Sequence, residues 1–196
     1  MFNIRKLIPN IPKTLTSPPP IPVSPLHRTL STVSPPPVTV SCILSHQSRW
    51  SKAITDISAA YLSNGDFVSK ASKAQSDLYA YEQGDVIFKP TKSTVPPFRP
   101  TPTAALSYFV GAVNVPEGHS EDMGFAINSG SGWSSVTFHN SSTTLLNGLG
   151  FACGVYDFVC ASSGDSVRVE YTKGYRRGDD GQVRLFLHHS SVPYGR

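Results

Sequence analysis

The 196-residue sequence predicts an α+β fold, a cone-shaped curved antiparallel sheet with N-terminal helices packed on its concave face. Two observations carry this prediction. Helical spacing of apolar residues dominates the middle of the chain, whereas after Gly118 the apolar residues recur at every second position. Helices followed by a run of strands are typical of α+β domains, and a chain of this length has room for one such domain.

Two helices are expected before the first strand. Residues 51–61 carry apolar side chains at helical spacing, with Ser51 as a candidate N-cap and Gly65 as part of a stop signal. Residues 67–79 show a weaker helical pattern. Both segments have one apolar side and are therefore expected to pack against the sheet.

A third helix is predicted over residues 101–110. Thr101 is a suitable N-cap, and Pro102 fits the first turn, where a missing N–H has no consequence. Tyr108 therefore lies on the second or third turn of this helix.

The strands come mostly in the second half of the chain. Period-two alternation predicts strands over residues 124–127, 133–139, 151–159, 166–175 and 182–191. The Asp180-Gly181 turn between the last two is a strong hairpin signal. An earlier short strand, over residues 85–88, must end before Pro90, because proline cannot donate to a ladder. Thr91 consequently lies at the exit of that strand.

Residues 1–50 are expected to be a disordered leader. No acidic residue precedes Asp56, and ten of the 17 prolines lie at or before Pro37. Proline clusters exclude regular structure, and the acid-free, Ser/Thr/Pro-rich composition is typical of an organelle transit peptide. We expect a chloroplast leader, with a mitochondrial leader or a plain disordered tail as alternatives, and a single mature domain over residues 51–196.

The net charge of +4 does not indicate a nucleic-acid-binding protein. Six basic residues precede Asp56, which leaves 11 of the 17 basic residues against all 13 acidic residues in the rest of the chain. The positive charge therefore belongs to the leader. No apolar stretch is long enough to span a membrane. Cys153 and Cys160 lie too far apart on one predicted strand to form a disulfide, so free thiols are expected.

The last predicted strand ends in four polar residues, HHSS. In a regular strand His189 and Ser191 continue the apolar face that begins at Val183, whereas His188 and Ser190 lie on the other face. We therefore expect His189 and Ser191 to point into the interior, with His188 and Ser190 as second choices. The alternative is a hydrated strand end whose polar groups bond only backbone and water.

A bound metal is not expected. Adjacent histidines on a strand point to opposite faces, and the other four histidines lack the spacing of a zinc site. The sequence indicates no other cofactor.

Several stretches together resemble the iota-class carbonic anhydrases. They are FKPT (88–91), ALSYFVGA (105–112), EDMGFAI (121–127), VEYTKGYRRGDDGQVRLFLHHSSVPY (169–194), and NGDF followed by DLYAYEQGDV. The resemblance covers residues 56–194. These enzymes belong to the SnoaL-like, nuclear-transport-factor-two-like superfamily, which also includes the association domain of calcium/calmodulin-dependent protein kinase II.

The resemblance implies a cone-shaped, commonly dimeric protein that interconverts CO2 and bicarbonate, in some members without metal and in others with a reported preference for manganese. A threonine after a strand-ending proline, a tyrosine of the third helix and a serine of HHSS would hold the bicarbonate. These residues correspond here to Thr91, Tyr108 and, by the face argument, Ser191, with His189 beside them as proton acceptor.

Two other functions remain open. The same cone could serve as a non-catalytic oligomerisation or small-ligand-binding module. It could also be another SnoaL-like enzyme, such as an isomerase or cyclase, which would need an acid in an apolar pocket. The mid-strand acids are Asp85, Asp157 and Glu170.

Overall fold

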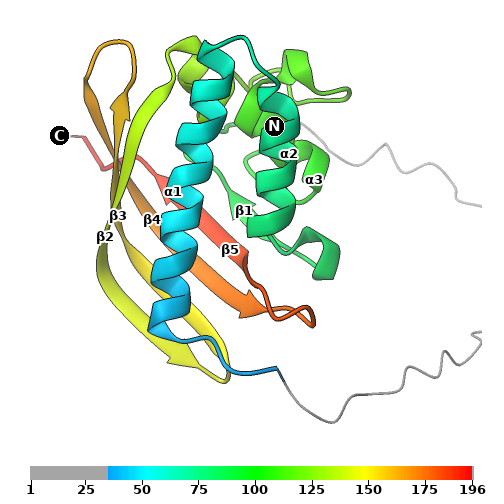
Figure 1. Ribbon diagram of the computed structural model, residues 1–196, viewed down its shortest axis with the longest axis vertical. Coiled ribbons are helices and arrows are strands. Elements are labelled where there is room, and N and C mark those ends of the chain that lie inside the picture. Colours follow the sequence, from blue (N-terminus) through cyan, green and yellow to red (C-terminus); the bar gives the residue numbers. More distant parts are fainter. Residues whose placement is uncertain (1–34, 196) are drawn as a thin grey trace, which may run out of the picture. The chain divides into compact units, whose positions relative to one another are not determined.

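A five-stranded sheet curves around helix α1, and the helices cover its concave face (Figure 1). The computed structural model describes residues 35–195. The helices are α1 (Val40–Leu62), α2 (Phe67–Leu78) and α3 (Pro102–Val110), with short 3₁₀ turns at Tyr81–Gln83, Ala112–Asn114 and Phe125–Gly130. The strands are β1 (Ile87–Lys89), β2 (Trp133–Leu146), β3 (Leu149–Cys160), β4 (Ser166–Arg177) and β5 (Val183–Ser191).

The sheet order is β1-β5-β4-β3-β2. Strands β2 to β5 form an antiparallel meander, and the short β1 adds to β5 in parallel. This pairing places the exit of β1 beside the polar end of β5, because Lys89 is in register with His189. The predicted α+β architecture is confirmed.

Helix α1 begins earlier than the sequence predicted. Thr39, not Ser51, is its N-cap, and the Thr39 hydroxyl accepts from the backbone N–H of Cys42. The first turns bury Ile43 and Trp50 in the core, so residues 40–50 belong to the folded domain rather than to a leader. The other described part of the predicted leader, residues 35–39, leads into the helix, and residues 1–34 lie outside the described residues.

The hydrophobic pattern did not reveal the first turns of α1, because polar residues lie on the buried side of the helix there. His46 contacts the carbonyl of Leu78 at 3.0 Å through Nε2. The Gln47 amide exchanges two hydrogen bonds with Asn140, at 2.8 and 2.9 Å. Both side chains are buried, and their partners lie far away in the sequence.

The other helices match the prediction, whereas one predicted strand is absent. Thr101 caps α3 by accepting from the N–H of Ala104, as its sequence pattern indicates. Residues 124–127, expected to be a strand, lead instead into the 3₁₀ segment Phe125–Gly130. Gly124, Asn128 and Ser129 all have positive φ angles, which interrupt an extended backbone.

Strand β5 departs from regular alternation at Phe186. Tyr175 of β4 pairs with Leu185, but Gly174 pairs with Leu187, so Phe186 has no partner in β4. This β-bulge reverses the facing of every later residue in β5. Gly174 makes room for it, because a Cβ atom there would lie 2.8 Å from Cζ of Phe186.

We expect Gly174→Val to lower the free energy of unfolding by about 1–3 kcal/mol, because the new side chain overlaps the Phe186 ring. The loss should shrink in a Phe186→Ala background, as urea denaturation of the four variants in the cycle would show. Thr172→Val, an exposed change on the same strand, is the control. Equal losses from Gly174→Val in both backgrounds would contradict the steric account.

Candidate active site at the end of strand β5

The bulge turns a different pair of HHSS residues into the interior than the sequence predicted. His188 and Ser190 are each 2% exposed, whereas His189 is exposed. Ser191 lies on the outer face, where its hydroxyl donates to Glu170 at 3.1 Å. The prediction that His189 and Ser191 point inward is therefore wrong, and the second choices, His188 and Ser190, take their place.

A chain of hydrogen bonds fixes the His188 ring. The Trp50 indole N–H donates to the Tyr79 hydroxyl at 3.0 Å. The Tyr79 hydroxyl lies 2.8 Å from Nδ1 of His188, and Nε2 of His188 lies 2.9 Å from the Ser190 hydroxyl. The indole N–H can only donate, so the Tyr79 hydroxyl accepts from it and donates its own hydrogen to Nδ1 of His188. The imidazole hydrogen therefore lies on Nε2. Ser190 then accepts from His188 and keeps its own hydrogen to donate.

His188 is held neutral. Burial lowers the pKa of His188 well below its usual value, and the nearby Lys173 and His46 act in the same direction. The ring also stacks on Phe88, with centroids 5.0 Å apart and planes 13° apart. With Nδ1 occupied by the Tyr79 hydroxyl, His188 acts as a fixed donor to Ser190 rather than as a free base.

Tyr156 of β3 completes this side of the site. Its hydroxyl lies 2.5 Å from that of Ser190 and 3.4 Å from Nε2 of His188. Burial raises the pKa of Tyr156, so it remains a neutral phenol. The sequence analysis missed Trp50, Tyr79 and Tyr156, although buried tyrosine and tryptophan generally need a polar partner.

Tyr108 of α3 and Thr91, which follows β1, lie on the other side of the site. The Tyr108 hydroxyl is buried without a hydrogen-bond partner among the described residues. Burial raises the pKa of Tyr108, and the nearby Thr91 side chain and Lys92 backbone oppose this only in part. Thr91 also lowers the pKa of Tyr156 in part, so its side chain lies near both phenols. Thr91 is itself half-buried, at the border with solvent.

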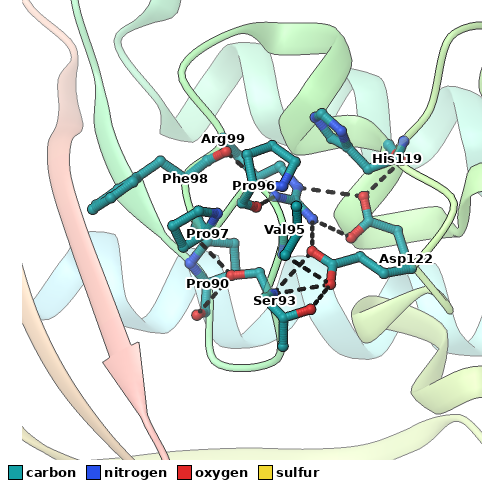
Figure 2. Close-up of polar contacts among 12 residues, drawn as sticks. Pro90, Ser93, Val95, Pro96, Pro97, Phe98, Arg99, His119 and Asp122 are labelled. Atoms are coloured by element: carbon teal, nitrogen blue, oxygen red, sulfur yellow. Dashed lines mark hydrogen bonds and ion pairs between the residues drawn. The ribbon is translucent and has the colours of Figure 1, made fainter. Parts of the chain in front are cut away.

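The loop that carries Thr91 is anchored by a buried arginine. Figure 2 shows Arg99 turned back into the loop, with Asp122 beside it. The Arg99 side chain is 0% exposed and donates to the carbonyl of Pro96 at 2.5 Å and to both carboxylate oxygens of Asp122. Its backbone N–H donates to the carbonyl of Phe88 at the centre of β1. The loop after β1 is thereby closed on itself.

The same ion pair joins the loop to helix α3. Asp122 accepts from the Ser107 hydroxyl at 2.7 Å, and Ser107 directly precedes Tyr108. The closest Arg99–Asp122 contact is 2.6 Å, and Glu121 adds a second carboxylate at 3.0 Å. Hydrogen bonds from Thr94, and then the contact with Arg99, lower the pKa of Glu121 to about 2. The position of Thr91 relative to Tyr108 therefore depends on this ion pair.

No described residues form a cluster that could hold a metal ion. Groups of three or more histidine, cysteine, aspartate or glutamate side chains with suitable geometry are absent from residues 35–195. The three cysteines are free thiols, as expected. No described helix is both long and apolar enough to cross a bilayer. Hydroxyl groups and one neutral imidazole line the site.

These features define an α+β protein with a buried, uncharged hydroxyl site on the concave side of its sheet. The sequence profile of the family described as "Metal-independent carbonic anhydrase" matches residues 41–192. A protein from Nostoc sp. (strain PCC 7120 / SAG 25.82 / UTEX 2576) described in the same words is 34% identical over 160 residues, which cover 80% of this chain and 75% of that protein.

A solved structure agrees with this match. The crystal structure of the iota-carbonic anhydrase from a cyanobacterium, complexed with bicarbonate, has a TM-score of 0.74 and 31% sequence identity, over 85% of this chain and 99% of that chain. The chain belongs to the metal-independent, iota-class carbonic anhydrases. The family predicted from the sequence is thus confirmed.

We expect Arg99→Met to lower the free energy of unfolding by about 3–5 kcal/mol, because it leaves the Asp122 carboxylate buried without its partner. The double variant Arg99→Met/Asp122→Leu should recover much of this loss, since it removes both charges. Thermal and urea unfolding measure both effects. Additive losses in the double variant would show that the two side chains do not act as a pair.

Proposed function

We propose that this chain catalyses the reversible hydration of CO2 to bicarbonate at the site formed by Thr91, Tyr108 and Ser190, without a bound metal. The observation that carries the proposal is the Tyr108 hydroxyl, which is buried near Thr91 and lacks a close hydrogen-bond partner among the described residues. A buried hydroxyl without a protein partner is suited to bind a ligand oxygen. The related cyanobacterial structure, which contains bicarbonate, supports bicarbonate as that ligand.

Each hydroxyl has a defined task in this proposal. In this proposal Tyr156 donates to Ser190, which also accepts from His188 and therefore keeps its own hydrogen for a substrate oxygen. Tyr108 remains a phenol, because burial raises its pKa, and is therefore a donor at neutral pH. Thr91, at the border with solvent, can orient the attacking water against CO2. Donors fixed before reaction stabilise the oxygen charge that develops as the C–O bond forms.

Positioning must replace the usual activation of water. A zinc enzyme lowers the pKa of its bound water to near 7, and the hydroxyl groups here supply no comparable charge. Holding water and CO2 in contact and fixing the donors can each contribute several kcal/mol, by rough estimates for such effects. We therefore expect slower turnover than in zinc-dependent carbonic anhydrases.

Alanine and phenylalanine variants distinguish the inward residues from the outward ones. We expect Thr91→Ala, Tyr108→Phe and Ser190→Ala each to lower kcat/KM by about 10²–10³-fold, as loss of one fixed donor does. The matched controls His189→Ala and Ser191→Ala should stay within about twofold, since both side chains lie on the outer face. A pH-drop assay of CO2 hydration on chelator-treated protein measures all five variants.

Three results would contradict this assignment. Loss of activity in Ser191→Ala but not in Ser190→Ala would restore the regular-strand interpretation. Activity lost on chelation and regained with Mn²⁺ or Zn²⁺ would contradict a metal-free mechanism. Wild-type protein that is inactive with and without metal would favour the non-catalytic binding module.

We further propose that the protein is a homodimer. The outer face of the sheet carries half-buried apolar residues, including Phe151, Val155 and Leu187, which a second copy could cover. The family resemblance supports the same assembly. Sedimentation equilibrium would give twice the monomer mass for a dimer and the monomer mass if this proposal is wrong.

We also propose import into the chloroplast, with residues up to about the start of α1 as the transit peptide. The acid-free, Ser/Thr/Pro-rich composition of this segment supports the proposal. Because Val38 is in the core and Thr39 caps α1, cleavage must precede Val38 if the mature fold is to remain intact. Import assays with isolated chloroplasts and mitochondria, followed by N-terminal sequencing, decide the organelle and the cleavage site.

A further inference from the structure

Lys173 of β4 is fully buried in a box of aromatic rings. Its side chain is 0% exposed, and Nζ has no hydrogen-bond partner among the described residues. Nζ lies over four rings, with distances to the ring centroids of 3.9 Å for Trp50, 4.5 Å for Phe138, 5.2 Å for Tyr156 and 5.6 Å for Tyr171. A buried amine of this kind is costly, and nothing in the packing of β4 requires it.

Lys173 is a direct neighbour of the proposed site. It forms a cross-strand pair with His188, and paired residues on one face of an antiparallel sheet have Cβ atoms about 4.5–5.5 Å apart. One of its four rings is Tyr156, whose hydroxyl contacts Ser190. Lys173 makes no direct hydrogen bond to the hydroxyl groups of the site among the described residues.

The groups that face Lys173 are neutral. Helix α1 contributes His46 and Trp50, and burial lowers the pKa of His46 to about 3. Strands β2 and β3 contribute Phe138 and Tyr156, β4 itself contributes Tyr171, and β5 contributes His188. No ion pair to Lys173 occurs among residues 35–195. Burial accordingly lowers the pKa of Lys173 well below its usual value.

The formation of bicarbonate places a negative charge in a site that is otherwise uncharged. Bicarbonate in the interior would be a buried negative charge, and Arg99 cannot balance it, because Glu121 and Asp122 already pair with that side chain. We propose that Lys173 is the electrostatic partner of bicarbonate, with a neutral amine in the empty site and a protonated one in the occupied site. This inference rests on the function proposed above.

The reaction balances with this residue included. CO2, water and the neutral amine of Lys173 give bicarbonate and the ammonium form of Lys173, so one C–O bond forms and one proton moves from water to the amine, by way of intervening water or hydroxyl groups. The interior keeps a net charge of zero throughout. The faces of the four rings stabilise the ammonium once it has formed, because aromatic faces attract cations.

Other interior groups are poorer acceptors of that proton. The free electron pair of His188 on Nδ1 is occupied by the Tyr79 hydroxyl, and burial favours the neutral imidazole. His46 is held neutral by burial as well. The phenols Tyr108 and Tyr156 already carry their protons, because burial raises their pKa values. The amine of Lys173 remains, and it lies over the ring of Tyr156.

The protonation state of Lys173 can be measured in the wild-type protein. With lysine labelled with ¹³C at the ε position, the Lys173 resonance, assigned by its absence in Lys173→Met, should report a neutral amine without bicarbonate and an ammonium group with saturating bicarbonate at the same pH. A resonance that remains neutral, or is charged in both states, while bicarbonate binds and CO2 is hydrated would overturn the Lys173 proposal alone.

Lys173→Met tests the energetic consequence, since methionine fills a similar volume without charge. We expect bicarbonate affinity, from chemical-shift titration of the protein, to fall roughly 10–100-fold, as loss of one nearby charge at intermediate dielectric predicts. The melting temperature should be unchanged or higher, because an unpaired buried amine has been removed. Lys70→Met, an exposed change on α2, is the matched control and should behave as wild type.

Two outcomes separate this inference from the proposed function. Unchanged affinity in a folded Lys173→Met protein would overturn the role of Lys173 and leave the hydration site in place. Wild-type protein that neither binds bicarbonate nor hydrates CO2 would overturn the proposed function, and the inference with it. If Lys173→Met does not fold, the Lys173 resonance is assigned instead by its through-bond correlations to the Lys173 backbone in the wild-type protein, and that measurement still decides the question.

Discussion

The unpaired Phe186 in β5 determines which side chains meet inside this protein. Without that bulge, Leu187 and His189 would face the helices, and His188 would point outward. With it, His188 comes opposite Lys173 and within reach of Tyr79, and Ser190 comes within reach of Tyr156. The site thus depends on a local backbone irregularity that a glycine on the neighbouring strand permits.

Two separate polar systems then hold the two sides of the site. On the sheet side, the chain from Trp50 through Tyr79 to His188 fixes the tautomer and leaves Ser190 with a hydrogen to donate. On the loop side, the Arg99–Asp122 pair holds the segment after β1 against helix α3. The sheet side is uncharged, whereas the loop side is held in place by a buried ion pair.

The sequence predicted what depends on local signals. Thr101 and Pro102 define the start of α3 by themselves, and Tyr108 follows from that start. The direction in which the His188 side chain points depends on Gly174. This glycine lies on strand β4, eleven positions before Leu185 along the chain. A period-two pattern within β5 alone could therefore not reveal that direction. A glycine inside a strand is nonetheless a known sign of a bulge, and it was the available signal. The first turns of α1 were missed because Gln47 is buried against Asn140, 93 residues away.

Burial affects the ionisable groups around the site in the same direction. Burial holds the two phenols and the imidazole of the hydroxyl cluster in their neutral forms. Such an environment favours CO2, which is uncharged, and disfavours bicarbonate, so by itself it would slow formation of the product. The neutral amine of Lys173, which lies over the Tyr156 ring, changes this balance, because it can acquire charge only when bicarbonate is present. The arrangement therefore admits both the neutral substrate and the charged product without a permanent charge in the core.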